Sequence, residues 1–425
     1  MPANGRRDRG LRVAAVDEAN LVLDAPGQVN VFLVAARLSP GGFVGPDGVP
    51  DMEGLRAALT ARIGELPPLR RVAVPLGRRH HWVEVVPDLT HHIRRSEPVS
   101  GLSGLELMCA GLMSVPLPRN RPLWELLIIP DTAGVEPWVV MRVHHAIADG
   151  VAAVGIVQHL FDNDAATGEA APIHEVPFRP RHRNLTGIIR NLPESVRRIA
   201  FTLTTRDIGT TRLLGVRSDN RGVTFVDADL AALRASVRPL GATVNDALLA
   251  AVASGYQALL PVLGERVPAV LPISVPVALP RRGTSGNQVG VMRVRLPLGE
   301  PDAEVRLRLI AEQTRLEKAQ ARLQGTLEFM RGPVGARLMN RVAAHQRLVA
   351  GFVTNVPGPA GRFRLAGAPV AALWPVGVLA GNVRLGVAAL SYGGRLNCSV
   401  HFDADALPGS VFSEAFAREL TRLSS

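Results

Sequence analysis

One stretch of the chain joins a strand-like segment to a helix-like segment through two adjacent histidines. The run PWVVMRV (137–143) is short, apolar and rich in valine, which is typical of a buried strand. After the motif HHAIADG (144–150), apolar residues recur at helical spacing. The chain is therefore predicted to run strand, turn, helix. Because successive side chains of an extended segment point to opposite faces, only one of His144 and His145 can face a given cavity.

The remainder of the first half mixes strands with one clear helix. The segments at 28–38, 80–89 and 124–131 are rich in Val, Ile, Leu and aromatic residues and predict strands. Residues 51–66 carry apolar side chains at the spacing of one helical face and predict a helix. The strand that precedes the histidines is expected to be buried along its length except at Arg142.

A linker divides the chain. Residues 162–184 are rich in Ala, Pro and charge without periodicity, and an amphipathic basic segment follows them. The second half repeats the mixed character, with expected helices over 226–237, from Asn245 and over 302–324, and strands at 267–277 and between 363 and 402. The predicted domains are 1–162, a linker over 163–206, and 207–425. The fold class is α/β, with mixed sheets and a site in the cleft between two halves.

Composition excludes several classes of function. The net charge is +11, but Lys318 is the only lysine and aromatic residues make up 4%, which disfavours a nucleic-acid interface. Cys109 and Cys398 form neither a disulfide framework nor a metal cluster. The apolar stretches 247–264 and 365–383 are interrupted by proline or glycine and predict a buried helix and short strands rather than membrane spans.

The start of the chain does not predict a targeting signal. The first twenty residues contain charged side chains but no apolar core, so no signal peptide is predicted and a cytoplasmic location is expected. The basic surface predicts peripheral contact with lipid head groups at a membrane or lipid-droplet surface.

Familiar catalytic motifs are missing from the sequence. The closest approach to a G-x-S-x-G elbow is GTSGN (283–287), which has Asn in place of the second Gly. A Walker A loop, a G-x-G-x-x-G turn and an H-E-x-x-H motif are not found. A metal site of His144, His145 and Asp149 would lack a further ligand cluster, so neither a metal nor a cofactor is expected.

The residues of the motif have individual interpretations. A histidine at the mouth of a strand, with an ordinary pKa near 6.5, is mostly neutral at pH 7 and can accept a proton. Asp149 is expected to cap the following helix, or to pair with an arginine. Gly150 allows a close backbone approach or an unusual dihedral angle.

HHAIADG fits the HHxxxDG motif shared by coenzyme A-dependent acyltransferases and peptide condensation domains. Further stretches, in order along the chain, resemble the bacterial wax ester synthase/diacylglycerol acyltransferase family. They are PLPRNRPLWEL (116–126), GATVNDALLAAVASG (241–255), RRGTSGNQVGVMRVRLP (281–297), TNVPGP (354–359) and LSYGGRLNCSVHFD (390–403). The resemblance implies two chloramphenicol-acetyltransferase-like subdomains with the active site in the channel between them.

The resemblance also implies a chemistry. The donor would be acyl-CoA and the acceptor a long-chain alcohol or a diacylglycerol. His145 would take the hydroxyl proton while the oxygen attacks the thioester, so that no acyl-enzyme forms. His144 would orient or pack, and Asp149 would hold the loop in shape.

Other candidate residues have two interpretations each. Asn245 is a candidate donor to the tetrahedral oxyanion or the N-cap of the helix that follows. Trp124 could line an acyl tunnel or fill the core. Asn287 and Gln288 are expected in a polar strand turn, and Asn355 in a tight loop beside the cleft, all as candidate substrate-binding residues.

Near its start the chain departs from the family pattern. Relatives usually carry a Ser-Pro-type lead into an aspartate, whereas this chain has VAAVDEAN (13–20) and keeps only Asp17. The identity of the acceptor is therefore left open. One alternative is an acyltransferase or condensation enzyme of specialised metabolism, acting on a polar small molecule or a carrier-bound acyl group. Another is a catalytically idle lipid-surface protein that binds through the basic segment 179–221.

Overall fold

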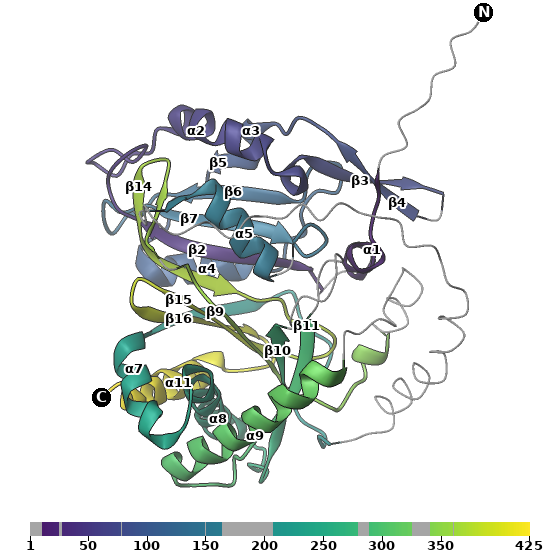
Figure 1. Ribbon diagram of the computed structural model, residues 1–425, viewed down its shortest axis with the longest axis vertical. Coiled ribbons are helices and arrows are strands. Elements are labelled where there is room, and N and C mark those ends of the chain that lie inside the picture. Colours follow the sequence, from purple (N-terminus) through teal and green to yellow (C-terminus); the bar gives the residue numbers. More distant parts are fainter. Residues whose placement is uncertain are drawn as a thin grey trace, which may run out of the picture.

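The protein is built from two large β-sheets, each with helices packed against it, and a small third sheet at one side (Figure 1). The computed structural model describes residues 11–24, 28–77, 79–148, 150–163, 207–278, 289–324, 341–359 and 361–425. The predicted basic helix after the linker, and the turn that contains Asn287 and Gln288, lie outside these ranges.

The first sheet has seven strands, and two of them come from the second half of the chain. In order across the sheet they are β5 (Ile93–Arg95), β6 (Trp124–Ile129), β7 (Trp138–His144), β2 (Val31–Leu38), β14 (Ala368–Val376), β13 (Phe363–Leu365) and β8 (Asp162–Asn163). Only the pair β5–β6 is parallel. The pairing of Val376 with Leu33 brings the end of β14 close to the start of β2.

Helices cover both faces of this sheet. Residues of α2 (Met52–Gly64) and α5 (Gly150–Leu160) form an apolar core on one face. On the opposite face, α4 (Gly101–Leu112) packs together with strand β9 (Arg221–Asp229) of the second sheet. The apolar stripe predicted for 51–66 is confirmed, because Leu55, Leu59 and Ile63 are all buried.

The second sheet has six strands with its helices gathered on one side (Figure 1). The order is β11 (Val289–Leu296), β10 (Leu271–Ala278), β12 (Phe352–Val356), β15 (Leu385–Tyr392), β16 (Arg395–Asp403) and β9. The packed helices are α7 (Leu230–Val237), α8 (Val244–Val262), α9 (Ala303–Gln324) and α11 (Gly409–Leu423). The helix α8 is the buried apolar helix predicted from the sequence, although it continues through Pro261.

The small sheet β1 (Leu11–Arg12), β4 (Arg79–Glu84) and β3 (Arg71–Leu76) lies beside α1 (Ala15–Leu23). The carboxylate of Glu18 on α1 accepts a hydrogen bond from Nη1 of Arg79 at 2.8 Å and from the backbone N–H of His80 at 2.9 Å. These contacts fix α1 against the small sheet. The position of α1 matters because the helix and the residues that follow it lie around the histidine motif. A short helix, α3 (Leu89–His92), completes the first half.

Side chains of the second sheet bond to the backbone of β14 and the loop after it. The Ser399 hydroxyl donates to the carbonyl of Pro375 at 2.5 Å, and Nδ1 of His401 lies 2.8 Å from the carbonyl oxygen of Gly377. The indole of Trp374 donates to Asp227 at 2.6 Å. The two sheets are therefore joined along β14, a strand that the second half of the chain contributes to the first sheet.

The sequence predictions for the exposure of Arg142 and for the start of the helix at 226 were wrong. Arg142 is only 3% exposed, because Glu125 faces it on β6 and forms a buried ion pair with it, and because the carbonyl oxygens of Leu112 and Val115 accept from the same guanidinium. The helix predicted from 226 begins later. Residues up to Asp229 pair with β16, and the Asp229 carboxylate then caps α7.

Within the described ranges, no helix combines the length and the apolarity that crossing a membrane requires.

Candidate functional site

The histidine pair lies where strand β7 ends. His144 is the last residue of β7 and pairs with Val31, the first residue of β2. His145 begins the turn, and α5 starts at Gly150. The predicted order of strand, turn and helix is confirmed. Asp149 lies outside the described residues, so its capping role stays a prediction.

His144 is a buried anchor whose two ring nitrogens are both bonded. The ring is 1% exposed. Its Nε2 lies 3.0 Å from Oδ2 of Asp24, and its Nδ1 accepts the backbone N–H of Ala146 at 2.9 Å. Because Nδ1 accepts, the neutral ring must carry its proton on Nε2 and donate it to the carboxylate. With both nitrogens engaged, His144 has no free lone pair with which to act as a base.

His145 has a different environment. Its ring is half-buried and meets the ring of Phe32 edge-on, with centroids 5.0 Å apart. Its backbone is held on both sides, since the N–H donates to the carbonyl of Asn30 at 2.9 Å and the carbonyl accepts from Nδ2 of Asn20 at 3.2 Å. Within the described part of the chain, no hydrogen bond reaches the His145 ring. The backbone is therefore fixed while the imidazole nitrogens stay available.

Burial lowers the pKa of His145 to about 4, with a smaller contribution from the neighbouring His144. Desolvation disfavours the protonated imidazole. The ring is therefore neutral at pH 7 and keeps an unshared lone pair, which is the state that a general base needs.

Three residues from the start of the chain complete the surroundings, although no sequence motif indicated them. Asn20 lies on α1, Asp24 follows its end, and Asn30 precedes β2. Nδ2 of Asn30 donates to Oδ1 of Asn20 at 3.0 Å, and the Asn30 N–H donates to Oδ1 of Asp24 at 2.7 Å. One available signal was the set of short polar side chains within DEANLVLDAPGQVN (17–30), immediately before a buried strand.

Asn245 is not the cap of its helix. Thr243 is the N-cap of α8, and it forms a capping box with Asp246, whose carboxylate accepts from the Thr243 N–H at 2.8 Å. Oδ1 of Asp246 also accepts from the buried hydroxyl of Thr314 at 2.6 Å, so both oxygens of Asp246 are engaged in structural contacts. Asn245 is the second helical residue and half-buried.

Trp124 lies in the core of the first half. It is 1% exposed, stacks on His92 with ring centroids 4.6 Å apart, and donates from Nε1 to the carbonyl of Leu69 at 2.9 Å. These contacts favour the core interpretation over a tunnel lining. The prediction of a tight loop at Asn355 was wrong, because the residue lies half-buried in β12 and pairs with Ala389 of β15, and the strand ends only at Val356. No contact in the described part of the chain joins Asn355 to the histidine pair.

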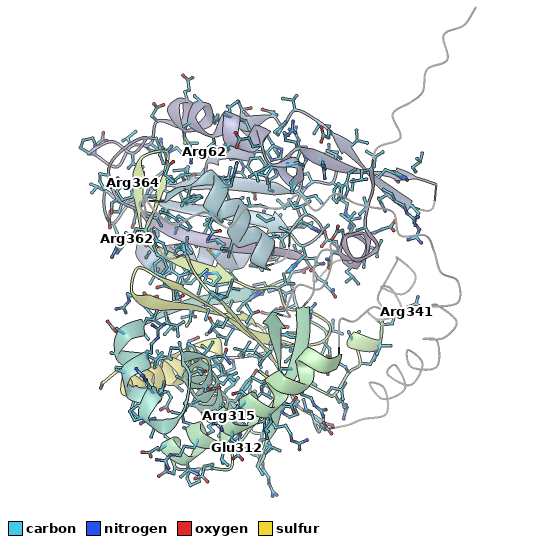
Figure 2. All side chains as sticks on the ribbon, viewed as in Figure 1. Arg62, Glu312, Arg315, Arg341, Arg362 and Arg364 are labelled. Atoms are coloured by element: carbon cyan, nitrogen blue, oxygen red, sulfur yellow. The ribbon has the colours of Figure 1, made fainter. Side chains whose placement is uncertain are left out.

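Two surface pockets lie away from the histidines. The larger, about 350 Å³, includes Arg362, Ser391 and Gly393 in its lining. Figure 2 labels Arg362 at the left edge of the molecule, below Arg364. The smaller, about 270 Å³, includes Arg212 and Asp403. Among the described residues, no group of three or more His, Cys, Asp or Glu side chains could hold a metal ion.

Two protein-family models match most of the chain. The family model for the wax ester synthase/diacylglycerol acyltransferase catalytic domain matches residues 14–248, and the model for the C-terminal domain of the same family matches 285–424. The chain belongs to this family. The resemblance inferred from HHAIADG and its flanking stretches is thereby confirmed, and the protein is an enzyme of an acyltransferase family active in lipid metabolism.

Relatives and solved structures extend the match. A Mycobacterium tuberculosis protein whose name reads "Putative diacyglycerol O-acyltransferase" is 29% identical over 399 residues, covering 84% of each chain. The wax ester synthase/diacylglycerol acyltransferase of Marinobacter aquaeolei VT8 superposes with a TM-score of 0.70 at 18% identity, covering 97% of this chain and 98% of that one. The first condensation domain of the CDA synthetase gives a TM-score of 0.62 at 18% identity, with coverage of 99% and 97%. The predicted mixed α/β fold with two sheet-based subdomains is confirmed.

Proposed function

We propose that this protein transfers a fatty acyl group from acyl-CoA to the hydroxyl of a long-chain alcohol or a diacylglycerol, with His145 as the general base. The observation that carries the proposal is the contrast within the pair. Both nitrogens of His144 are engaged, whereas the half-buried, neutral ring of His145 has no hydrogen-bond partner among the described residues. Family membership supplies the expectation of an acyl-CoA donor and an acceptor.

The reaction needs no covalent enzyme intermediate. A ring nitrogen of His145 accepts the proton of the acceptor hydroxyl while its oxygen bonds to the thioester carbonyl carbon. The tetrahedral intermediate then collapses, the carbon–sulfur bond breaks, and His145 returns the proton to the departing CoA thiolate. Atoms and charge balance without a further reactant.

Burial has opposite effects on the two stages of this reaction. It keeps His145 unprotonated before reaction, but it also makes the ring a weaker base than free imidazole. The oxyanion that forms on the substrate provides an opposite charge beside the new imidazolium, and an opposite charge within about 4–6 Å favours the charged form. Proton transfer is therefore coupled to attack rather than preceding it.

The oxyanion also requires a hydrogen-bond donor, and we assign this role to Asn245. Its side chain makes no hydrogen bond to the described residues, and it is half-buried in the first turn of α8. Because Thr243 and Asp246 already cap the helix, the Asn245 amide is free to donate to substrate.

The experiment is a transfer assay with free CoA as the readout. Purified protein is incubated with palmitoyl-CoA and a panel of long-chain alcohols, diacylglycerols, polar alcohols and amines, alongside His145→Ala and His144→Ala variants. Release of CoA with the long-chain alcohols or diacylglycerols, abolished in His145→Ala, supports the proposal. Turnover confined to polar alcohols or amines would instead assign the protein to specialised metabolism. Anionic liposomes added to the same assay test whether a lipid surface promotes turnover.

A further inference from the structure

We propose that Asp24 is a positioning residue for His145: it holds His144 in the one tautomer that fixes the turn on which His145 stands. The inference rests on the proposed function, since it gives a further residue a role in the same site. Asp24 lies outside the HHxxxDG motif, 120 positions before His144.

Both oxygens of the Asp24 carboxylate are occupied by donors. Oδ1 accepts from the Asn30 N–H at 2.7 Å, and Oδ2 faces Nε2 of His144 at 3.0 Å. The guanidinium of Arg119 lies 3.7 Å from Oδ2. Burial alone would raise the pKa of Asp24, but the His144 and Asn30 hydrogen bonds and the Arg119 charge outweigh it and lower the pKa. Asp24 is therefore ionised at pH 7, and an ionised carboxylate can only accept.

An acceptor at this position selects the tautomer of His144. Nε2 must carry the proton, which leaves the lone pair of a neutral ring on Nδ1. That lone pair accepts the N–H of Ala146, two residues further along, and thereby closes the turn around His145. In the other tautomer, an Nδ1–H would face the Ala146 N–H, and two donors would oppose each other in a buried site.

A second path leads from Asp24 to the same turn. The residue whose N–H binds Oδ1 of Asp24, Asn30, also uses its carbonyl to accept the N–H of His145 at 2.9 Å. One carboxylate thus holds the turn through the ring of His144 on one side and through the backbone of Asn30 on the other. Neither path brings Asp24 into contact with the His145 ring, so its effect on the reaction is positional.

This geometry predicts that asparagine cannot replace Asp24, although the two side chains have nearly the same shape. Asparagine has one acceptor oxygen and one NH₂ group, whereas the site presents two donors. In one of the two contacts, the asparagine NH₂ group must therefore face another hydrogen-bond donor. If the NH₂ faces His144, the ring is driven toward the tautomer that opposes the Ala146 N–H.

The test compares Asp24→Asn with Asp51→Asn. Asp51 caps α2 through a single oxygen, Oδ1, which accepts from the Glu53 and Gly54 N–H groups, so asparagine can preserve that cap. We expect Asp24→Asn to lower kcat at least about tenfold with KM for acyl-CoA within about twofold, which is less than the roughly 10⁴-fold loss when asparagine replaces the tautomer-setting aspartate of a serine protease. Asp51→Asn should leave both constants unchanged. An Asp24→Asn variant with kcat within about twofold of the parent would overturn the proposal.

A second readout is independent of turnover. Long-range ¹⁵N–¹H spectra of histidine-labelled protein report which ring nitrogen carries a proton, and the His144 signal is assigned by its loss in His144→Gln. We expect an Nε2–H tautomer in the parent protein and loss of that pattern in Asp24→Asn. An unchanged His144 tautomer would refute the role of Asp24 even if the assay found no acceptor. Conversely, the expected spectra without turnover on any acceptor would count against the proposed function alone.

Discussion

Oδ2 of Asp24 lies 3.0 Å from Nε2 of His144, so the start of the chain holds the first histidine of the motif in place. The second histidine differs in every respect that matters for proton transfer. Its ring is half-buried, its nearest ring neighbour is the apolar Phe32, and its pKa is lowered to about 4. The adjacent histidines are therefore an anchor and a base, with distinct consequences when each is replaced.

His145→Ala should lower kcat by at least about a hundredfold, because a general base typically contributes a hundred- to ten-thousandfold. The fold should survive, since among the described residues the hydrogen bonds that hold His145 are made by its backbone N–H and carbonyl. Steady-state CoA release, with circular dichroism as the control for folding, measures both. Full activity in His145→Ala would mean that another group takes the proton.

His144→Ala removes the anchor rather than the base. The buried carboxylate of Asp24 and the N–H of Ala146 would each lose a partner, and an unpaired buried polar group costs about 1–3 kcal/mol. We therefore expect His144→Ala to lower the free energy of unfolding more than His145→Ala does. Urea denaturation of the two variants side by side gives the comparison, and equal stabilities would contradict the anchor role.

The local part of the site could be read from the sequence, and the long-range part could not. The strand, turn and helix around HHAIADG follow from side-chain periodicity, which is a property of neighbouring residues. The contact of Asp24 with His144 and the pairing of Val376 with Leu33 join distant segments, and periodicity carries no information about partners. The sequence therefore could not predict the sheet to which β14 belongs, since this strand of the second half lies in the first sheet.

The errors at Arg142 and at residue 226 have a common physical cause. A charged side chain in an apolar strand is normally assigned to solvent, but Glu125 on the neighbouring strand neutralises Arg142 in the core. Residues 226–237 have apolar positions at helical spacing, yet the first of them complete the pairing of β9 with β16 before Asp229 caps the helix. Tertiary pairing overrode the local preference in both cases.

Glu125→Ala should be strongly destabilising because it leaves the Arg142 guanidinium buried and without its ion-pair partner. Breaking a buried pair in this way costs about 3–5 kcal/mol. The double variant Glu125→Leu/Arg142→Met should recover most of the loss, since it removes both charges and fills the space with apolar atoms. Guanidinium denaturation of the parent, the single and the double variant tests this, and a double variant less stable than Glu125→Ala would contradict it.

The protein should lose stability as the pH falls from about 6.5 toward 4. Burial lowers the pKa of His401 to about 3 and that of His145 to about 4, below the ordinary value near 6.5. Between the lowered pKa values of the folded protein and the ordinary value near 6.5, the unfolded chain binds more protons than the folded one. The free energy of unfolding is therefore largest above pH 6.5 and declines below it. His401→Gln keeps a donor for the Gly377 carbonyl but does not titrate, and it should flatten the pH dependence of the urea midpoint. The same substitution at exposed His345 serves as the matched control, and an equal effect from both would refute the assignment to burial.

Asn245→Ala and Thr243→Ala should separate catalysis from capping at the start of α8. Thr243→Ala removes the N-cap hydroxyl and should cost about 1 kcal/mol of stability with little change in kcat. Asn245→Ala removes no cap, so it should leave the urea midpoint near that of the parent while lowering kcat by about a hundred- to a thousandfold, the loss typical of one oxyanion donor. Because the two residues are two positions apart on the same turn, each variant is the control for the other. If Asn245→Ala destabilised the protein and spared kcat, the oxyanion donor would have to be sought on another element.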